Sequence, residues 1–361
     1  MRTSAWRRSR LLILCYHGIS LDDEHEWDSS LYMSPADFEA RLRSIQRSGC
    51  AVLPLGIALE RLYANALHEP AVAITFDDGL YDFLRRAYPL LKKYGFPATV
   101  YLTTYYCEHQ QPVFPSFCSY VLWKGRDAVL DTAGMLDAKE QWDLRTNAGR
   151  DGAFKSIIEF ADRQRLTAEE KAGLAAAVAR RLGVDHDSLI AKRVLHLLNP
   201  REVAELAANG VDFQLHTHRH YALPDRALFL REIHDNRERI RDIAGSEPTH
   251  FCYPCGYYER DWLPWLAEAG VTSATTGEPG LASSRANPLL LPRLVDTSHL
   301  APVEFEAWLG GVGTLLPRRP RKAAARPLSE EIRVASACRP SGNGPIASQG
   351  AGTTWHSSVH T

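Results

Sequence analysis

The stretch Ala71–Gly79 reads A-V-A-I-T-F-D-D-G and decides the fold expected for this chain. Six strand-forming residues run directly into two carboxylates and a glycine, so a buried strand should end at Asp77 and Asp78. The carboxyl ends of parallel strands carry the chemistry of α/β enzymes, which makes both acids site candidates. Their mutual repulsion must be offset by a metal ion, a basic partner or a shared proton. This stretch alone is equally consistent with a strand-to-helix turn in which an Asp caps the helix.

Strand-like and helix-like segments alternate along the chain, which is typical of βαβ units in a parallel sheet or barrel, and the fold class is therefore α/β. Strands are expected at Leu11–Cys15, Ala51–Leu53, Ala71–Phe76, Ala98–Leu102, Val211–Leu215, His250–Tyr253, Ser273–Thr276 and Leu289–Val295. Helices are expected at Pro35–Ser48, Leu55–Ala66, Tyr81–Tyr94, Pro200–Asn209, Pro224–Ala244, Arg260–Glu268 and Pro302–Leu309. Several of these helices open with Pro or close near Gly, as helices commonly do.

Two regions interrupt this alternation. Residues 105–199 contain aromatics followed by charged, Ala-rich helical stretches, and we expect a helical insertion there within a domain that spans residues 11–317. The insertion is interpreted either as a cap over a site or as plain helical elaboration. Towards the C-terminus the composition shifts to Arg, Pro, Ala, Ser and Gly, so a disordered tail is expected at residues 318–361. A basic segment, residues 1–10, precedes the domain.

The composition of the 361 residues, 45% hydrophobic and 24% charged, is ordinary for a globular enzyme. A formal net charge of -1 argues against nucleic acid as a partner, because such binding rests largely on a strong basic field. Seven scattered cysteines favour reduced thiols over a disulfide framework, so a cytoplasmic location is expected. The apolar run after the basic N-terminus stops at Tyr16 without a cleavage site and is interpreted as a first strand. No stretch has the length of a transmembrane helix.

A second informative stretch is V-D-F-Q-L-H-T-H-R-H at Val211–His220. It is another strand-like run, and a parallel sheet would deliver its histidines to the edge where the two acids lie. His216 and His220 are four residues apart, so a turn of helix places both imidazoles on one side, while His218 points elsewhere. Two imidazoles and one carboxylate form a three-ligand site with open positions for water, which is typical of catalytic metal centres. The alternative is a solvated histidine run.

Three motifs resemble those of the polysaccharide deacetylase superfamily (NodB homology, carbohydrate esterase family 4): T-F-D-D-G at Thr75–Gly79, H-T-x-x-H at His216–His220 and F-x-Y-P-x-G at Phe251–Gly256. The resemblance covers about Leu11 to Leu309. It implies a distorted (β/α) barrel of about seven parallel strands. It also implies a divalent metal, usually Zn²⁺, that serves hydrolysis of an N-acetyl group on an amino sugar. By the same resemblance Asp77 is the general base, and the metal ligands are Asp78, His216 and His220.

The chemistry agrees with these roles. An amide is a poor electrophile, so a metal must polarise its carbonyl and activate a water while Asp77 removes the proton of that water. The family stabilises the oxyanion with the metal and the backbone N–H after the motif proline, which belongs to Cys255 here. Members with R-x-P-Y hold the base with an arginine, whereas this chain has Cys252 at that position. Arg293 is the candidate for the missing tether, and an ordinary arginine near a strand end is the alternative.

The departing amine needs a proton, and a histidine is the natural donor. The usual family arrangement places it in a late L-x-H motif, for which His299 in D-T-S-H-L is the candidate. A permuted subset of the family carries the acid on the first strand, which I-L-C-Y-H-G at Ile13–Gly18 resembles. His17 is therefore favoured over His299, and a histidine that only hydrogen-bonds at a strand end is the alternative.

The expected function is metal-dependent removal of N-acetyl groups from an amino-sugar polysaccharide or glycoconjugate. An O-acetyl esterase or another amidohydrolase is an alternative, because the same site attacks esters. The missing motif arginine also leaves open a non-catalytic carbohydrate-binding homologue, although a pure binder needs no base. The expected partner is the N-acetylated substrate itself. The sequence does not indicate the exact sugar, the metal used in the cell or the oligomeric state.

Overall fold

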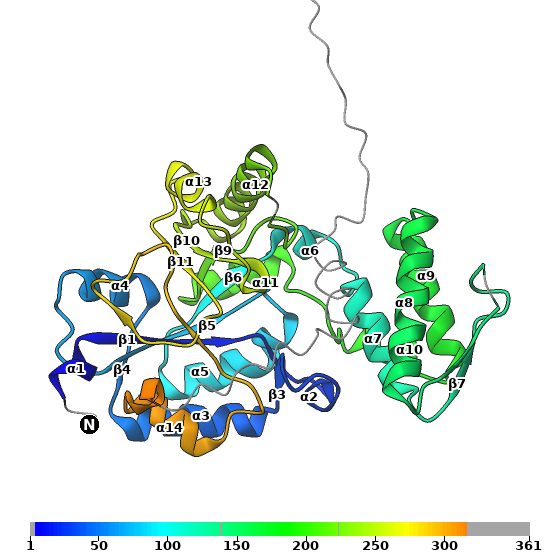
Figure 1. Cartoon of the computed structure of the whole chain (residues 1–361), viewed down its shortest axis with the longest axis horizontal. Coiled ribbons are helices and arrows are strands. Elements are labelled where there is room, and N and C mark those ends of the chain that lie inside the picture. The colour runs from blue at the N-terminus through cyan, green and yellow to red at the C-terminus, as the bar shows by residue number, and fades with distance from the viewer. Residues whose placement is uncertain (1–3, 138, 223, 316–361) are drawn as a thin grey trace, which may run out of the picture.

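The computed structural model describes residues 4–137, 139–222 and 224–315, and its centre is one curled sheet (Figure 1). The predicted distorted (β/α) barrel of about seven strands is confirmed, and the strands are mostly parallel. The exception is β12, which runs antiparallel to β1. The predicted disordered tail, residues 318–361, lies outside the described residues. In order across the sheet, the seven strands are β11 (Ser273–Thr275), β10 (His250–Cys252), β9 (Asp212–Leu215), β6 (Thr99–Leu102), β5 (Ala71–Phe76), β1 (Arg10–Tyr16) and β12 (Ala282–Ser283).

The central strands β1 and β5 are buried on both faces, which explains their nearly continuous apolar sequences. Successive side chains of a strand point to opposite faces, and the two faces belong to two hydrophobic clusters. Leu12 and Val72 pack in the larger cluster beneath the surrounding helices. Leu11 and Ala71 pack in a smaller cluster that also contains Tyr101 and Cys252, from strands further along the curl. The curl of the sheet therefore encloses a core of its own.

One short segment links the two ends of the curl. Leu291 forms a parallel bridge with Thr275, the last residue of the edge strand β11. A few residues later, β13 (Leu294–Val295) pairs in parallel with β1. Arg293 lies between these two contacts, so the segment that joins the ends of the sheet also carries the predicted tether. A further strand off the main path, β4 (Ala51–Val52), pairs with β5.

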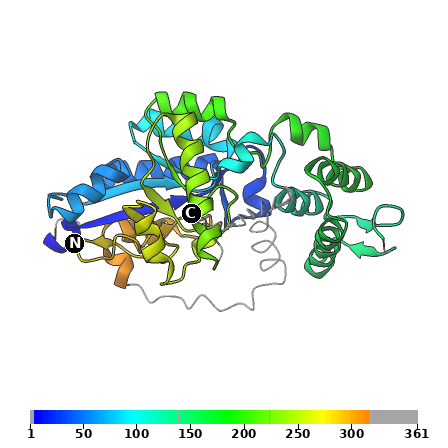
Figure 2. The ribbon, with the colours of Figure 1, turned by 90° about the horizontal axis from the view of Figure 1, so that it is seen from above.

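Helices cover the sheet on both sides (Figures 1 and 2). Those that follow the sheet strands are α3 (Pro35–Ser48), α4 (Leu55–Tyr63), η1 (Phe83–Ala87), α5 (Tyr88–Tyr94), α11 (Pro200–Ala208), α12 (Arg226–Ala244), α13 (Trp262–Glu268) and α14 (Pro302–Leu309). Their ends follow local rules, since α3 begins at a Ser34 cap and ends at Gly49 in the left-handed conformation. The helix expected at Leu55–Ala66 ends at Tyr63, close to Asn65, whose φ of 52° interrupts the helix.

Residues 105–199 contain a helical lobe at one side of the sheet in both views (Figures 1 and 2). Its elements are α6 (Thr104–Glu108), α7 (Phe114–Lys124), β7 (Val129–Asp131), β8 (Gln141–Asp143), α8 (Asn147–Arg163), α9 (Ala168–Arg181) and α10 (His186–Ala191). The side chains of α7, α8 and α9 form a hydrophobic cluster of their own. A capping box between Thr167 and Glu170 starts α9. The interpretation of this segment as an insertion stays a prediction.

The N-terminal residues pack onto the sheet. Arg7, in α1 (Ala5–Arg8), is buried and donates to the carbonyls of Leu309, Arg10 and Ala71. The remaining elements are β2 (Gly18–Ile19), α2 (Glu24–Trp27), β3 (Tyr32–Met33), η2 (Pro254–Gly256) and η3 (Val312–Leu315). Among the described residues, no helix combines the length and the apolar character needed to cross a membrane.

Candidate metal centre and active site

Two histidines converge on Asp78 at the carboxyl ends of β5 and β9. The Nε2 atoms of His216 and His220 each lie 3.3 Å from Asp78 Oδ1. The three ligand atoms lie within 4.8 Å of one another, as atoms that bind one cation must. The strand between β5 and β9 is β6, and the Thr103 N–H at its end donates to the Asp78 carbonyl at 3.2 Å. The sheet order therefore brings together residues that are far apart in the sequence.

The ring of His216 is held by its neighbours. Its Nδ1 lies 2.9 Å from the carbonyl oxygen of Cys252, which only accepts, so Nδ1 carries a hydrogen and Nε2 faces Asp78. The backbone N–H of His216 donates to Asn236 Oδ1 at 2.9 Å. Asn236 Nδ2 in turn donates to the Leu102 carbonyl and to Thr104 Oγ1. Such outer contacts fix the orientation of metal-binding histidines.

The charges at this centre favour a cation. Burial alone would raise the pKa of Asp78, but the hydrogen bond from His216 and the charge of His220 lower it to about 2. Burial would likewise lower the pKa of His216, yet Cys252 and Asp78 hold it well above its ordinary value. An ionised carboxylate with two imidazole nitrogens is a donor set that fits a divalent transition metal.

Asp77 is held by Arg293 beneath this centre. The guanidinium makes two hydrogen bonds, from Nη1 to Oδ1 at 2.7 Å and from Nη2 to Oδ2 at 2.8 Å. Both side chains are buried, with exposures of 5% for Asp77 and 2% for Arg293. Burial alone would raise the pKa of Asp77, but the charge and hydrogen bonds of Arg293 hold it well below its usual value. Asp77 therefore stays ionised in a closed setting.

The two histidines predicted as proton donors have different surroundings. His17 Nε2 lies 3.9 Å from Asp77 Oδ2, next to the centre and beyond hydrogen-bonding distance. His299 is exposed, and its Nε2 lies 2.9 Å from Ser29 Oγ. The roles of both residues stay predictions. His218, expected to point away from the metal ligands, is buried with Nδ1 2.8 Å from Thr104 Oγ1.

Several site residues adopt a backbone conformation that costs energy. Asp78, Thr217, His220 and Cys255 have positive φ angles of 71°, 62°, 59° and 57°. Residues other than Gly rarely adopt these angles, and such strain gathers at functional sites. Cys255 is exposed in the turn η2, directly after the motif proline. Gly79 has a φ of 82°, and a Cβ there would come within 2.3 Å of Leu102 Cδ1.

Two thiols at Asp77 were not assigned a role from the sequence. Cys15 and Cys252 each place Sγ 3.4 Å from Asp77 Oδ2. Cys252 was noted only as a replacement for the motif arginine. A signal for Cys15 was present, because residues two apart on a strand share a face and Cys15 is two residues before His17. For Cys252 the signal was its place in the motif, because the resemblance implies that the residue at this position contacts the base.

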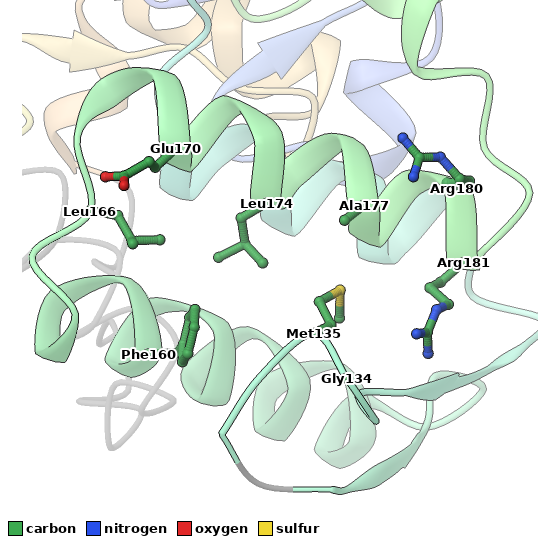
Figure 3. A pocket seen from close by; sticks show the side chains of 9 residues that line it. All are labelled: Gly134, Met135, Phe160, Leu166, Glu170, Leu174, Ala177, Arg180 and Arg181. Atoms are coloured by element: carbon green, nitrogen blue, oxygen red, sulfur yellow. The ribbon is translucent and has the colours of Figure 1, made fainter.

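A separate pocket of about 530 Å³ lies in the helical lobe, between α8, α9 and the loop that follows β7 (Figure 3). Its walls combine apolar side chains with Glu170, Arg180 and Arg181, and none of the predicted site residues lines it. The lining residues are Gly134, Met135, Phe160, Leu166, Glu170, Leu174, Ala177, Arg180 and Arg181.

A curled α/β sheet with one carboxylate and two imidazoles at its carboxyl edge defines a class of metal-dependent hydrolase sites. The family model for polysaccharide deacetylase matches residues 64–135 and 166–274, about half of the chain. The chain belongs to the polysaccharide deacetylase family. The matched residues include both acids and both histidines of the candidate metal centre, whereas His17, Arg293 and His299 lie outside them.

Relatives of known sequence or structure agree with this membership. YxkH of Bacillus subtilis, whose name assigns it to the polysaccharide deacetylases, is 37% identical over 105 residues, 28% of this chain and 36% of that protein. The chain therefore matches only about a third of the length of this relative. The Streptococcus pyogenes deacetylase PplD, solved in complex with acetate, has a TM-score of 0.54 at 19% identity and covers 84% of this chain and 98% of its own.

Another solved structure is IcaB from Ammonifex degensii, with a TM-score of 0.51 at 16% identity over 84% of this chain and 97% of its own. A third is BC0361, a polysaccharide deacetylase from Bacillus cereus, with a TM-score of 0.50 at 17% identity over 83% of this chain and 69% of its own. At these identities the likeness establishes a shared fold.

Proposed function

We propose that this protein is a metal-dependent de-N-acetylase of an amino-sugar polysaccharide or glycoconjugate, with Zn²⁺ as its metal. The observation that carries the proposal is the convergence of Asp78, His216 and His220 beside a second carboxylate that Arg293 holds ionised. A pure ligand-binding site would need no ionised acid buried next to the metal centre. Family membership and the acetate in the PplD structure support acetyl transfer to water, because acetate is the acid product of such a reaction.

The roles of the residues follow from their positions. The metal, when bound, supplies a Lewis acid that polarises an acetyl carbonyl and lowers the pKa of water. Asp77 accepts the proton of the attacking water, since it is ionised and lies next to the metal ligand Asp78. His17 donates a proton to the departing amine nitrogen. The backbone N–H of Cys255 donates to the oxyanion of the tetrahedral intermediate.

An O-acetyl esterase is the second candidate, because an ester needs less help to expel its leaving group and the same site would hydrolyse it. The two activities are separated by the product, since only N-deacetylation releases a primary amine. A panel of an N-acetylated chito-oligosaccharide, a UDP-linked N-acetyl sugar and an O-acetylated xylan, each assayed for acetate and for free amine, distinguishes them. Acetate released from the O-acetylated xylan, with neither acetate nor amine from either N-acetylated probe, would exclude the de-N-acetylase.

The ligand assignment is tested by metal content. Purified protein should bind about one Zn²⁺ per chain, and His216→Ala or His220→Ala should abolish tight binding, because two protein ligands hold a catalytic metal poorly. His186→Ala is the matched control, since His186 lies in α10 of the lobe. Full metal content in both ligand variants would remove the assignment.

The base is tested separately from the metal. Asp77→Asn should retain the metal and lower kcat by about 100-fold or more, since general base catalysis typically contributes 10²–10⁴-fold. The measurement is acetate release with metal content determined in the same sample. A variant that keeps both metal and turnover would show that Asp77 is not the base.

A further inference from the structure

The carboxylate of Asp77 is contacted by two buried thiols as well as by Arg293. Cys15 lies in β1 and Cys252 in β10, and both are fully buried. Their Sγ atoms lie 3.4 Å from the same oxygen, Asp77 Oδ2. Within the part of the chain that the structure describes, the contacts of these thiols with carbonyl oxygens are longer, 3.9 Å from Cys15 to Tyr16 and 3.6 Å from Cys252 to Tyr253. The carboxylate is therefore the nearer acceptor for both S–H groups.

Cys252 also accepts a hydrogen bond. Arg293 Nη2 lies 3.1 Å from Cys252 Sγ as well as 2.8 Å from Asp77 Oδ2. A thiol that accepts from the guanidinium has its hydrogen free to point at the carboxylate. Arg293, Cys252 and Asp77 thus form a closed set of three contacts that fixes the thiol rotamer and the carboxylate plane together.

The contacts divide unequally between the two carboxylate oxygens. Oδ2 receives Arg293 Nη2 and both thiols, whereas Oδ1 receives Arg293 Nη1. A carboxylate oxygen offers about two lone-pair sites, so beside Arg293 Nη2 the two thiols share the second site of Oδ2. Oδ1 has the single contact with Arg293 Nη1, so the thiols add their contacts to one side of the carboxylate only.

We infer that Cys15 and Cys252 are positioning residues that donate S–H hydrogen bonds to Asp77 Oδ2 and, together with Arg293, fix the carboxylate of the base. The role of Asp77 as a base rests on the proposed function, whereas the two thiol contacts do not depend on it. Both thiols act through Asp77 and touch no substrate. Cys252 contacts both Arg293 and Asp77, so the thiol and the guanidinium hold the carboxylate together.

The kinetic test compares variants that remove the S–H donor with variants that replace it by a hydroxyl donor. Cys15→Ala and Cys252→Ala should each lower kcat by about tenfold with KM unchanged, because a hydrogen bond to a charged group is lost in the reacting state. Cys15→Ser and Cys252→Ser, which restore a donor, should recover most of that loss. Cys118→Ala is the matched control, since Cys118 is equally buried but lies in α7 of the lobe. The probe is the N-acetylated chito-oligosaccharide.

Infrared spectroscopy tests the contacts without any turnover. A thiol that donates to a carboxylate absorbs at a lower S–H stretching frequency than one without a strong acceptor. Single Cys→Ser variants assign each band, and the Cys15 and Cys252 bands should lie below the Cys118 band of the same wild-type protein. Bands of Cys15 and Cys252 at or above that of Cys118 would overturn the inference, and so would Ala variants with unchanged kcat.

The two tests also separate this inference from the proposed function. A wild-type protein that hydrolyses no acetylated probe would contradict the proposed function, while low-frequency S–H bands would still establish the thiol contacts to Asp77. Serine variants that fold and remain as slow as the alanine variants would contradict the positioning role. Folding of each variant is checked by its circular dichroism and metal content.

Discussion

At the candidate site, two carboxylates that are neighbours in the sequence contact different side chains. Asp78 faces two imidazoles, and Asp77 faces Arg293 and two thiols. The positive φ of Asp78 turns its side chain away from that of Asp77, so the two acids serve different partners. A guanidinium at Asp77 and two imidazoles that could share a metal with Asp78 thus offset the repulsion between the acids; a basic partner and a metal were two of the alternatives that the motif left open.

The first prediction for individual residues concerns the proton donor. His17→Gln should lower kcat for N-acetylated substrate by about 100-fold or more, because the amine leaves poorly without a proton. His299→Gln should leave kcat within about twofold, since His299 is exposed and contacts Ser29. Both variants should keep their metal, and acetate release is the measurement. A slow His299 variant beside an active His17 variant would reverse the assignment.

The sequence predicted the positions of the acids and histidines because each follows directly on an apolar strand. It offered Arg293 only as one candidate tether, since a contact between residues 216 positions apart depends on how the sheet curls. The contacts of Cys15 and Cys252 were not predicted, because a thiol in a strand usually packs as a small hydrophobic residue. The side-chain partners of Asp77 thus required the three-dimensional structure.

Secondary-structure elements were likewise predictable where the local sequence has a clear pattern and were missed where it has none. All eight expected strands are present at least in part, although Leu289–Val295 is a strand only at Leu294–Val295. Most of them contain a buried apolar run that the sequence pattern detects. The short strands β2, β3, β7, β8 and β12 were not expected, since their two or three residues form no strand pattern of their own. The antiparallel direction of β12 was also missed, because a two-residue strand gives no indication of its direction.

A buried cluster joins three elements at the end of the sheet that β13 closes. Asp296 follows β13, accepts from Arg41 Nε of α3 at 3.0 Å, and accepts from the hydroxyl of Tyr16 in β1 at 3.0 Å. Its backbone N–H donates to the Cys15 carbonyl. Burial raises the pKa of Asp296 to about 6, although Arg41 and Tyr16 oppose the rise.

This raised pKa leads to a prediction about pH. The folded state binds the Asp296 proton more tightly than the unfolded state, so this group stabilises the fold below pH 4 and loses that contribution as the pH rises through about 6. Asp296→Asn does not titrate. The free energy of unfolding of the variant relative to wild type should therefore increase between pH 4 and pH 7 by about 2 kcal/mol.

Urea unfolding of both proteins at several pH values measures the change. Only the difference between the proteins is informative, because the lowered pKa values of Asp77 and Asp78 act in the opposite direction in both. A difference that stays constant over this range would show that Asp296 has an ordinary pKa in the folded protein. Asp242→Asn, at an exposed position of α12, serves as the control.

The whole molecule consists of the curled sheet with its helices and of the lobe, and the chain that returns from the lobe contacts the active-site turn. Leu198 N–H donates to the Gly79 carbonyl, and Tyr81 N–H donates to the His196 carbonyl. Gly79 directly follows the metal ligand Asp78. A movement of the lobe would therefore be transmitted to the turn that carries both acids.

The loop after β2 holds the lobe through one carboxylate, Asp23. It accepts from the hydroxyl of Tyr120 and from Lys124 Nζ at 2.7 Å, both in α7. Tyr120 is fully buried, so its hydroxyl has little access to water as a substitute partner. Asp22, the preceding residue, pairs with Lys192 at 2.9 Å between exposed side chains.

We predict that Asp23→Ala loosens the lobe without unfolding the sheet. Loss of the carboxylate leaves a buried hydroxyl and an ammonium without their acceptor, at a cost of about 1–3 kcal/mol. Amide hydrogen exchange should become about tenfold faster or more in α7 and α9 and stay unchanged in β1 and β5, because the lobe has its own hydrophobic cluster. Asp22→Ala should change little, since exposed ion pairs contribute about 0–1 kcal/mol. Equal acceleration in lobe and sheet would show that the two open as one cooperative unit, and the contacts of Gly79 and Tyr81 with the returning chain would then be the stronger link.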